Sequence, residues 1–365
     1  MARTDQWRSV RRYLNEHRYD LAAVAQDLYP EVDHVAGTPL LCRSEWLPSR
    51  PIDLADLRLT WSADAKPPVW NGAEAEAQSI CAGHSTYASA MAAFDSPRLF
   101  EDRFSYRLLD IALDERRMRY GPAAYFDGVN VGEAVAHELA ELVQRGQRPK
   151  LAELPFRALV GDPTLLSQRP VLPAISMLTL RRDAQQGDMT FVLHWRDPAH
   201  VAHGGGLYQV MPVGVFQPID DSPAARQRDF DLWRCVVREY SEEFLGTTEH
   251  YDEAFDYEQW PFYRTLTEAQ EQGLLRAYVL GMGVDPLTFA TDVLAVTVMD
   301  AQLYDEVFED LVDVNPEGKI LAHDARGFPF ESDVVNRLTT REPMQAAGAA
   351  VLSLAWRHRE FLGQF

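Results

Sequence analysis

The chain has 365 residues, of which 46% are hydrophobic and 25% are charged, and its formal net charge is −20. These values are typical of a globular protein with one or two domains, and they exclude a disordered or fibrous chain. The negative charge repels phosphate backbones and anionic lipid, which argues against nucleic acid as a partner, although a bound divalent cation can reverse the sign locally.

The cysteine pattern and the hydropathy pattern predict a cytoplasmic protein. Cys42, Cys81 and Cys235 are far apart, which argues against a disulfide framework and for a reducing compartment. No apolar run in the sequence has the length of a membrane span, and the amino terminus lacks the apolar core of a signal peptide. Lysine is rare beside arginine and alanine is common, a composition typical of G+C-rich bacterial genomes.

The first part of the chain predicts helices and short strands. Apolar residues recur at helical spacing over residues 6–29, and the Ala-rich stretch 73–94 also predicts a helix. Residues 104–118 are typical of a strand, a turn and a second strand, with a further turn expected near Gly121. Asn130 can cap a helix over residues 131–145, which Gly146 would end.

The second part has a different pattern, in which strands and helices alternate. An amphipathic helix is predicted over residues 231–244, and Gly246 ends it. The other expected elements are strands at 174–180, 189–195, 208–216, 275–284 and 293–299, a turn at 184–187, helices at 301–311 and 344–362, and a further element from 328 to 330. This alternation predicts layered α/β packing. The change of pattern divides the chain into an amino-terminal α+β domain (1–160) and a second domain (165–365).

Three carboxylates in the amphipathic helix form a candidate metal site. Glu239, Glu242 and Glu243 follow the spacing i, i+3 and i+4, which places them on one face of an α-helix. Like charges at this spacing destabilise the helix unless a cation compensates them. Mg²⁺ and Mn²⁺ prefer such oxygen ligands. Arg238, next to Glu239, is a candidate for orienting that carboxylate.

The stretch Arg238-Glu239-Tyr240-Ser241-Glu242-Glu243 resembles the signature helix of the Nudix hydrolase family. Further likenesses in order are a Gly-rich turn at 204–206, a corner at Pro212-Val213-Gly214, and the later stretches Asn315-Pro316-Glu317-Gly318 and 327–330. The resemblance covers the second domain and implies a Nudix-like α/β/α sandwich with a mixed sheet.

The resemblance also implies an activity and a set of site residues. Glu239, Glu242 and Glu243 would hold Mg²⁺ or Mn²⁺, Glu317 would complete the metal shell or act as base, and Glu239 and Arg238 would be catalytic. The corner residue Gly214 would contact the substrate. Independently of the resemblance, Arg196 is a candidate substrate contact, because Arg suits bidentate phosphate pairing. The expected function is metal-dependent hydrolysis of a nucleoside diphosphate-linked or related pyrophosphate substrate. The first domain would contact the substrate or form the dimer interface common among such proteins.

Two departures from the family pattern leave other functions open. The segment 217–229 looks inserted before the helix, and Phe230 stands where the family has a Glu, which leaves Asp220, Asp221 or Asp229 as substitutes. A non-catalytic Nudix-fold protein that senses or binds a nucleotide-like ligand is therefore an alternative. A Nudix-like enzyme used for other chemistry in specialised metabolism is another, since a fold does not determine a function.

Two groups of histidines are weaker signals. His137-Glu138-Leu139-Ala140-Glu141 begins like a zinc-peptidase helix but has Glu141 in place of the second histidine, so an exposed helix stretch is expected. His194, His200 and His203 lie close together in the sequence, but spacing alone does not show a metal site, and strand-end and loop histidines are the expected interpretation.

Overall fold

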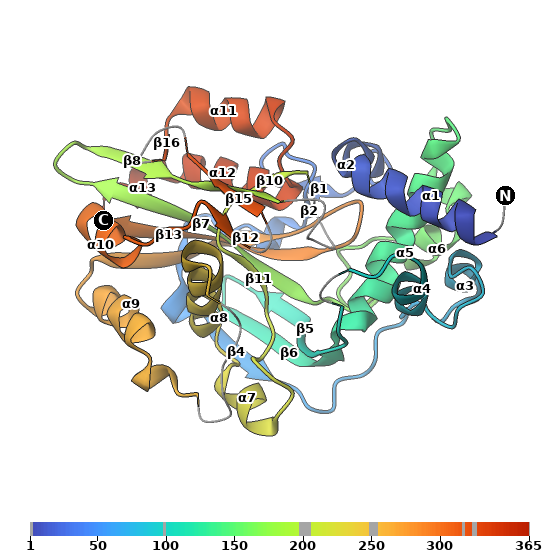
Figure 1. Ribbon diagram of the computed structural model, residues 1–365, viewed down its shortest axis with the longest axis horizontal. Coiled ribbons are helices and arrows are strands. Elements are labelled where there is room, and N and C mark those ends of the chain that lie inside the picture. Colours follow the sequence, from blue (N-terminus) through green and yellow to red (C-terminus); the bar gives the residue numbers. More distant parts are fainter. Residues whose placement is uncertain are drawn as a thin grey trace.

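A mixed nine-stranded sheet forms the centre of the computed structural model, which describes residues 3–97, 100–196, 206–247, 255–315, 318–322 and 327–364 (Figure 1). Its strands are β1 (Asp33–His34), β2 (Leu41–Cys42), β3 (Ile52–Asp53), β7 (Pro173–Asp183), β8 (Asp188–Phe191), β11 (Val213–Val215), β12 (Leu275–Val284), β13 (Thr291–Asp300) and β16 (Phe328–Pro329). The strand order is β1-β2-β12-β13-β7-β8-β16, with β11 beside β7 and β3 beside β12. β13 and β7 run parallel, and the other pairs are antiparallel.

Helices cover both faces of this sheet. Most residues of β7, β12 and β13 are buried, as expected for strands covered on two sides. In Figure 1, α11 (Ser332–Arg341) and α12 (Ala346–Arg357) lie above the sheet, and α8 (Leu232–Glu239) and α9 (Pro261–Glu271) lie below it. The structure is therefore of the α/β class with a mixed sheet, as the sequence predicts.

Two smaller sheets and the remaining helices complete the described part of the chain. One small sheet has the order β4-β6-β5 and the other β10-β9-β15-β14. Their strands are β4 (Arg58–Trp61), β5 (Phe104–Ala112), β6 (Arg117–Ala124), β9 (Leu193–Arg196), β10 (Tyr208–Gln209), β14 (Val314–Asn315) and β15 (Gly318–Leu321). The remaining helices are α1 (Arg3–Glu16), α2 (Arg18–Gln26), α3 (Ala75–Ile80), α4 (Tyr87–Phe94), α5 (Tyr125–Gln144), α6 (Pro155–Val160), α7 (Pro223–Arg228), α10 (Ala301–Val307) and α13 (Arg359–Leu362). Short 3₁₀ turns lie at Ser44–Trp46, Leu54–Asp56, Leu151–Glu153 and Tyr257–Gln259.

The central sheet draws strands from both sides of the predicted division at residues 160–165. β2 and β3 both pair with β12, so a segment of the first part extends the sheet of the second. Two buried arginines, one on each side of the division, also bind the segment around the start of β13. Arg157 donates to the carbonyls of Pro286 and Leu287, at 2.6 Å each, and Arg169 donates to Thr291 Oγ1 at 3.0 Å.

The two guanidinium groups also face one aromatic ring. The ring of Phe289 lies 4.8 Å from the Arg157 guanidinium carbon and 5.5 Å from that of Arg169. Such cation–π contacts are stronger in a buried setting. The loop between β12 and β13 is therefore held by Arg157 of the first part and by Arg169 near the start of the second.

α1, α2 and α5 are joined by buried charges and rings. Arg11 forms an ion pair with Glu133, and Arg18 lies 3.1 Å from the same carboxylate. His137 stacks on Trp7 with ring centroids 5.1 Å apart. Burial, helped by the charge of Arg11 and opposed by that of Glu133, lowers the pKa of His137 to about 3. The expectation that the helix stretch around His137 is exposed is wrong, because this histidine is 3% exposed.

Other expectations fail where side chains have tertiary partners. Asn130 does not cap a helix, because α5 begins at Tyr125 and Asn130 Oδ1 accepts a hydrogen bond from the Ala88 amide at 2.9 Å. Gly121 lies within β6 and not in a turn. A Cβ at this position would lie 2.8 Å from Ala65 Cβ, so close packing requires the glycine. The predicted end of this helix is confirmed, because Gly146 follows α5 with a φ of +77°.

Several predicted elements are divided in the structure. The helix expected over 73–94 is two helices, α3 and α4, separated by Gly83 with a φ of +98°. The strand expected over 208–216 is two strands, β10 and β11, on either side of a cis Met211–Pro212 peptide bond. The closing helix is α12 followed by α13. The strands β7, β12 and β13 lie where the sequence predicts strands.

None of the helices in the described segments combines the length and the apolar character that a membrane crossing requires. Cys42, Cys81 and Cys235 are all buried and carry free thiols.

Candidate functional site

The candidate site is built on the acidic segment, which we define as residues 232–246. Asp231 caps α8 by accepting a hydrogen bond from the Arg234 amide at 3.0 Å. α8 ends at Glu239, and residues Tyr240–Phe244 continue as one π-helical stretch. Gly246 closes the segment with a φ of +65°. Its amide donates to the Glu242 carbonyl at 3.1 Å, which satisfies a carbonyl at the end of the helix.

The π-helical stretch changes the expected spacing of the three carboxylates. The sequence predicts a continuous α-helix over 231–244, but the structure is α-helical only as far as Glu239. A π-helix has i→i+5 hydrogen bonds and fits an additional residue into the turn, so residues after Glu239 no longer follow α-helical positions. Glu239 and Glu242 are half-buried, whereas Glu243 is 5% exposed. Single π-helical turns within helices often mark functional sites.

Glu239 lies against the backbone of Gly214. A Cβ placed on Gly214 would lie 1.9 Å from Glu239 Oε1 and 2.0 Å from its Cδ, so no other residue fits at this position without a shift. Gly214 stands in β11, paired with Ile175 of β7. The structure thus brings together two of the predicted site residues, the corner glycine and the first carboxylate.

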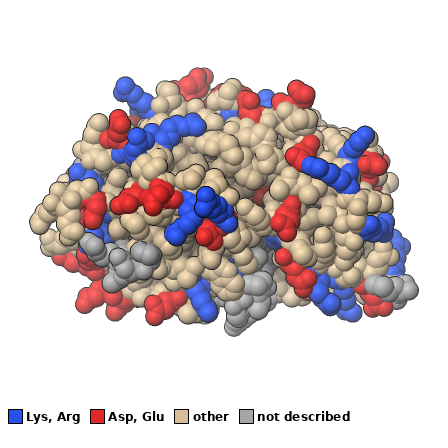
Figure 2. Space-filling model, turned by 90° about the horizontal axis from the view of Figure 1, so that it is seen from above, with Lys and Arg blue, Asp and Glu red and all other residues tan. Residues whose placement is uncertain are grey.

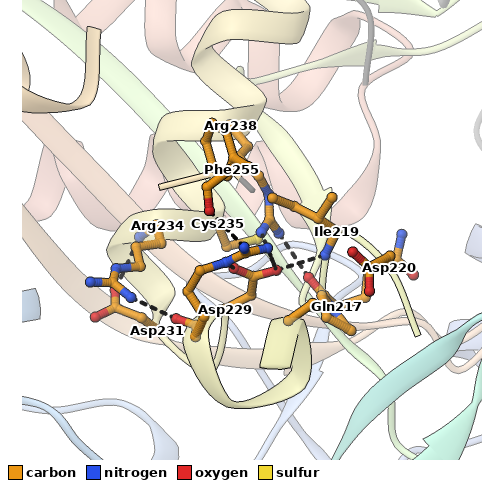
Figure 3. A network of polar contacts seen from close by, with 12 residues as sticks. Gln217, Ile219, Asp220, Asp229, Asp231, Arg234, Cys235, Arg238 and Phe255 are labelled. Atoms are coloured by element: carbon orange, nitrogen blue, oxygen red, sulfur yellow. Dashed lines mark hydrogen bonds and ion pairs between the residues drawn. The ribbon is translucent and has the colours of Figure 1, made fainter. Parts of the chain in front are cut away.

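Arg238 contacts the segment that precedes α8 (Figure 3). Its guanidinium donates to Tyr257 Oη at 2.8 Å and to the Gln217 carbonyl at 2.7 Å. It also lies 3.6 Å from the Asp229 carboxylate, which is fully buried. These contacts fix α8 onto residues 217–229 and onto Tyr257, so the structure gives Arg238 a positioning role there.

Asp229 is the acidic residue before the helix that reaches Arg238. Its other contacts are with Arg228 Nε, at 2.9 Å, and with the Ile219 amide, at 2.8 Å. Asp220 instead accepts from the Ser222 amide, and Asp221 accepts from the Phe104 amide. The sequence does not distinguish the three carboxylates, because two of them have partners in other elements, Phe104 of β5 and Arg238 of α8.

Asn315 connects the end of the acidic segment to the small sheet β10-β9-β15-β14. Its Nδ2 donates to the Glu243 carbonyl at 3.0 Å. Its Oδ1 lies 3.1 Å from His194 Nε2 and accepts from the Gly318 amide at 2.9 Å. The sequence singled out Asn315 only as part of a family-like stretch, because its contacts are between residues far apart in the chain.

Arg196 stands on β9 two residues after His194, so the two side chains leave the same face of that strand. Arg196 is half-buried and pairs in register with Gly318. The structure therefore places this predicted substrate contact on the sheet that Asn315 links to the acidic segment. Glu317, His200 and His203 lie outside the described residues.

Two carboxylates of the acidic segment lie close to Cys235. Burial raises the pKa of this thiol to about 12. Arg238 lowers the pKa, whereas Glu239 and Glu242 both raise it. The described residues contain no group of three or more His, Cys, Asp or Glu side chains arranged to hold a metal ion. A metal site at the acidic segment therefore stays a prediction.

Two surface cavities lie elsewhere. An open groove of about 830 Å³ runs along α1 and the start of α2, and both basic and acidic side chains line it. A pocket of about 250 Å³ lies beside β5 and β6. Neither is lined by Glu239, Glu242 or Glu243.

The charge on the molecular surface is mixed. On the face seen in Figure 2, basic side chains stand beside acidic ones among the described residues, with no continuous basic stripe. This arrangement does not favour a nucleic-acid backbone as a ligand.

No protein-family model matches the chain, and no curated protein matches it significantly in sequence.

Proposed function

We propose that the second part of the chain is a Nudix-like domain that hydrolyses a nucleoside diphosphate-linked or related pyrophosphate substrate with Mg²⁺ or Mn²⁺. The observation that carries this proposal is the packing of Glu239 on Gly214. A carboxylate held against strand backbone, at the start of a π-helical turn with two more carboxylates, is a specialised arrangement. The local order of β11, the 217–229 segment and α8 supports the same interpretation.

The side chains of the acidic segment fit a hard divalent cation in their chemistry. Glu239, Glu242 and Glu243 supply carboxylate oxygens, the ligands that Mg²⁺ and Mn²⁺ prefer. Glu317 is the further candidate ligand. When bound, the metal would supply charge neutralisation for the diphosphate and lower the pKa of a coordinated water.

The chain's own groups would position the substrate and take up the proton. Arg196 would pair with a phosphate group, and the backbone at Gly214 would contact the substrate. Glu239 or Glu317 would accept the proton of the attacking water. Arg238 would act indirectly, because its contacts with Asp229 and Tyr257 hold α8 in place.

The test combines metal binding with turnover. The protein is incubated with a panel of nucleoside diphosphate compounds and Mg²⁺ or Mn²⁺, and release of monophosphate is measured. Glu242→Gln and Glu243→Gln should lower turnover at least about a hundredfold, because each removes a metal ligand. Glu268→Gln on the neighbouring α9, an exposed site, is the control with the same loss of charge.

Mn²⁺ binding followed by electron paramagnetic resonance gives the second readout. The proposal requires that Glu242→Gln weakens Mn²⁺ binding while Glu268→Gln does not. Saturable nucleotide binding with no product would favour the ligand-sensing alternative. Turnover that is unchanged in both carboxylate variants would overturn the assignment of the site.

A further inference from the structure

A proline-walled pocket stands beside the sheet β4-β6-β5. Its volume is about 250 Å³, and Pro67, Pro68, Pro122 and Pro170 line it, together with Arg107. Proline fixes φ and has no N–H to donate, so these walls are stiff and poor in hydrogen-bond donors. We name this cavity the proline pocket. It shares no lining residue with the acidic segment and is independent of the proposed function.

Arg107 is the cation of the pocket and is buried with few partners. It stands on β5 and is 5% exposed. Nη2 donates to the carbonyl of Lys66, while Nε is buried without a hydrogen-bond partner among the described residues. A guanidinium has five N–H donors, and buried charges are ordinarily paired. Most donors of Arg107 therefore have no protein acceptor in the described part of the chain.

A carboxylate of the same pocket compensates this charge only in part. Asp127 also lines the pocket, and its Oδ2 accepts from the Ala124 amide at 2.8 Å as a cap of α5. Burial lowers the pKa of Arg107, and Asp127 offsets part of that shift. The amino end of α5, a helix of 20 residues, adds partial positive charge at the same rim.

We infer that the proline pocket binds a small oxyanion, a carboxylate or a phosphate group, on the guanidinium of Arg107. The planar fork of arginine matches both groups with paired hydrogen bonds. One water needs only roughly 10–15 Å³, so the pocket has room for a ligand of several heavy atoms and not merely a bridging water. The mouth of the pocket is open to solvent, so an anion can enter, and the stiff proline walls keep the shape of the site.

The test measures anion-dependent stability with the full chain. The midpoint of thermal unfolding is recorded against increasing inorganic phosphate, sulfate or acetate, with chloride keeping the ionic strength constant. EDTA is present throughout, so that the cation required by the proposed metal site is absent and the two proposals fail separately. A ligand that binds only the folded state raises the midpoint in a saturable manner. The phosphate and acetate series show which kind of oxyanion the pocket prefers.

Three variants distinguish this site from general charge effects. Arg107→Met keeps the length of the side chain and should abolish the anion response. Asn71→Asp adds a negative charge to the pocket lining and should weaken anion binding about tenfold. The aspartate keeps an Oδ1 atom, which can still accept the hydrogen bond from the Ala73 amide. Arg119→Met on β6, an exposed site of the same sheet, removes the same charge and should leave the response unchanged.

The folding state of each variant is checked by its unfolding transition in chloride alone. Arg107→Met should fold, since it removes a poorly compensated buried charge. The inference is overturned if the oxyanions act no more strongly than chloride on the natural chain. It is equally overturned if Asn71→Asp binds as the natural chain does, or if Arg119→Met loses the response to the same extent as Arg107→Met.

Discussion

Gly214 and Glu239 fit each other at the scale of single atoms. The carboxylate occupies the space that a side chain at position 214 would fill, so any larger residue there would have to displace Glu239. The same contact holds Glu239 half-buried at the point where the α-helix becomes a π-helix. Its position is thus set by a strand and a helix together.

Replacing Gly214 with Ala should displace the Glu239 side chain and destabilise the fold by about 1–3 kcal/mol, the usual cost of overpacking. Because Glu239→Ala removes the clashing atoms, the double variant should recover much of this loss. The free energies of unfolding in urea, arranged as a double-mutant cycle, give the coupling between the two sites. If the effects of the two substitutions on the free energy of unfolding are additive, the close contact does not contribute to stability, and the prediction is wrong.

At the scale of elements, the contact of α1 with α5 contains a titratable group. His137 is neutral in the folded protein because its pKa lies at about 3, mainly through burial. In the unfolded chain a histidine has a pKa of about 6.5. Between these two values the unfolded chain binds a proton that the folded protein does not.

Stability should therefore fall as the pH drops below about 6.5, by about 1.4 kcal/mol per pH unit for this one group until the folded pKa is reached. His137→Gln keeps a polar partner for the Tyr87 hydroxyl, which lies 3.0 Å from His137 Nδ1. The variant should lose this part of the pH dependence. Urea unfolding at pH 8, 6, 5 and 4 measures it, and equal slopes for both proteins between pH 6 and 4 would contradict the prediction.

The sequence predicts well those elements whose local pattern of apolar residues and glycines determines the secondary structure. The strands β7, β12 and β13 are long apolar runs, and Gly146 and Gly246 end helices because they adopt positive φ. The sequence does not predict the π-helical turn after Glu239, because Tyr240–Phe244 has the residue pattern of an α-helix. Its Tyr240 hydroxyl lies 2.8 Å from Thr179 Oγ1 of β7, a distant contact that local periodicity cannot show.

The residues of the candidate site also fall into two groups, those that the sequence indicates and those that only the fold reveals. The carboxylates and Gly214 are predicted from residue type and order, since their chemistry is visible locally. Asn315 and Asp229 acquire their contacts from the fold: one bonds the Glu243 carbonyl and the other lies beside Arg238. Such contacts depend on how distant segments pack, which a single sequence does not reveal.

At the scale of the whole molecule, the central sheet contains strands from both sides of the predicted division at residues 160–165. β2 and β3 pair with β12, and Arg157 binds the loop that follows it. A fragment of residues 165–365 would lack all three partners and expose part of the β12 edge. Open strand edges of this kind promote association between chains.

We therefore expect the 165–365 fragment to aggregate or to lose a cooperative unfolding transition when it is produced alone. Production together with a fragment of residues 1–160 should yield a soluble complex, because the missing strands are supplied in trans. Size-exclusion chromatography and urea unfolding test both expectations. A soluble monomeric fragment with a sharp transition would instead establish an independent second domain.

The burial of the three free cysteines makes their reactivity a probe of local motion. Cys42 lies on β2, Cys81 follows α3 and Cys235 lies within α8, and each is at most 1% exposed. A thiol-modifying reagent can react with each of them only when its surroundings open. Mass spectrometry can follow the labelling of each cysteine separately. The three labelling rates would therefore measure how often three different parts of the molecule open locally.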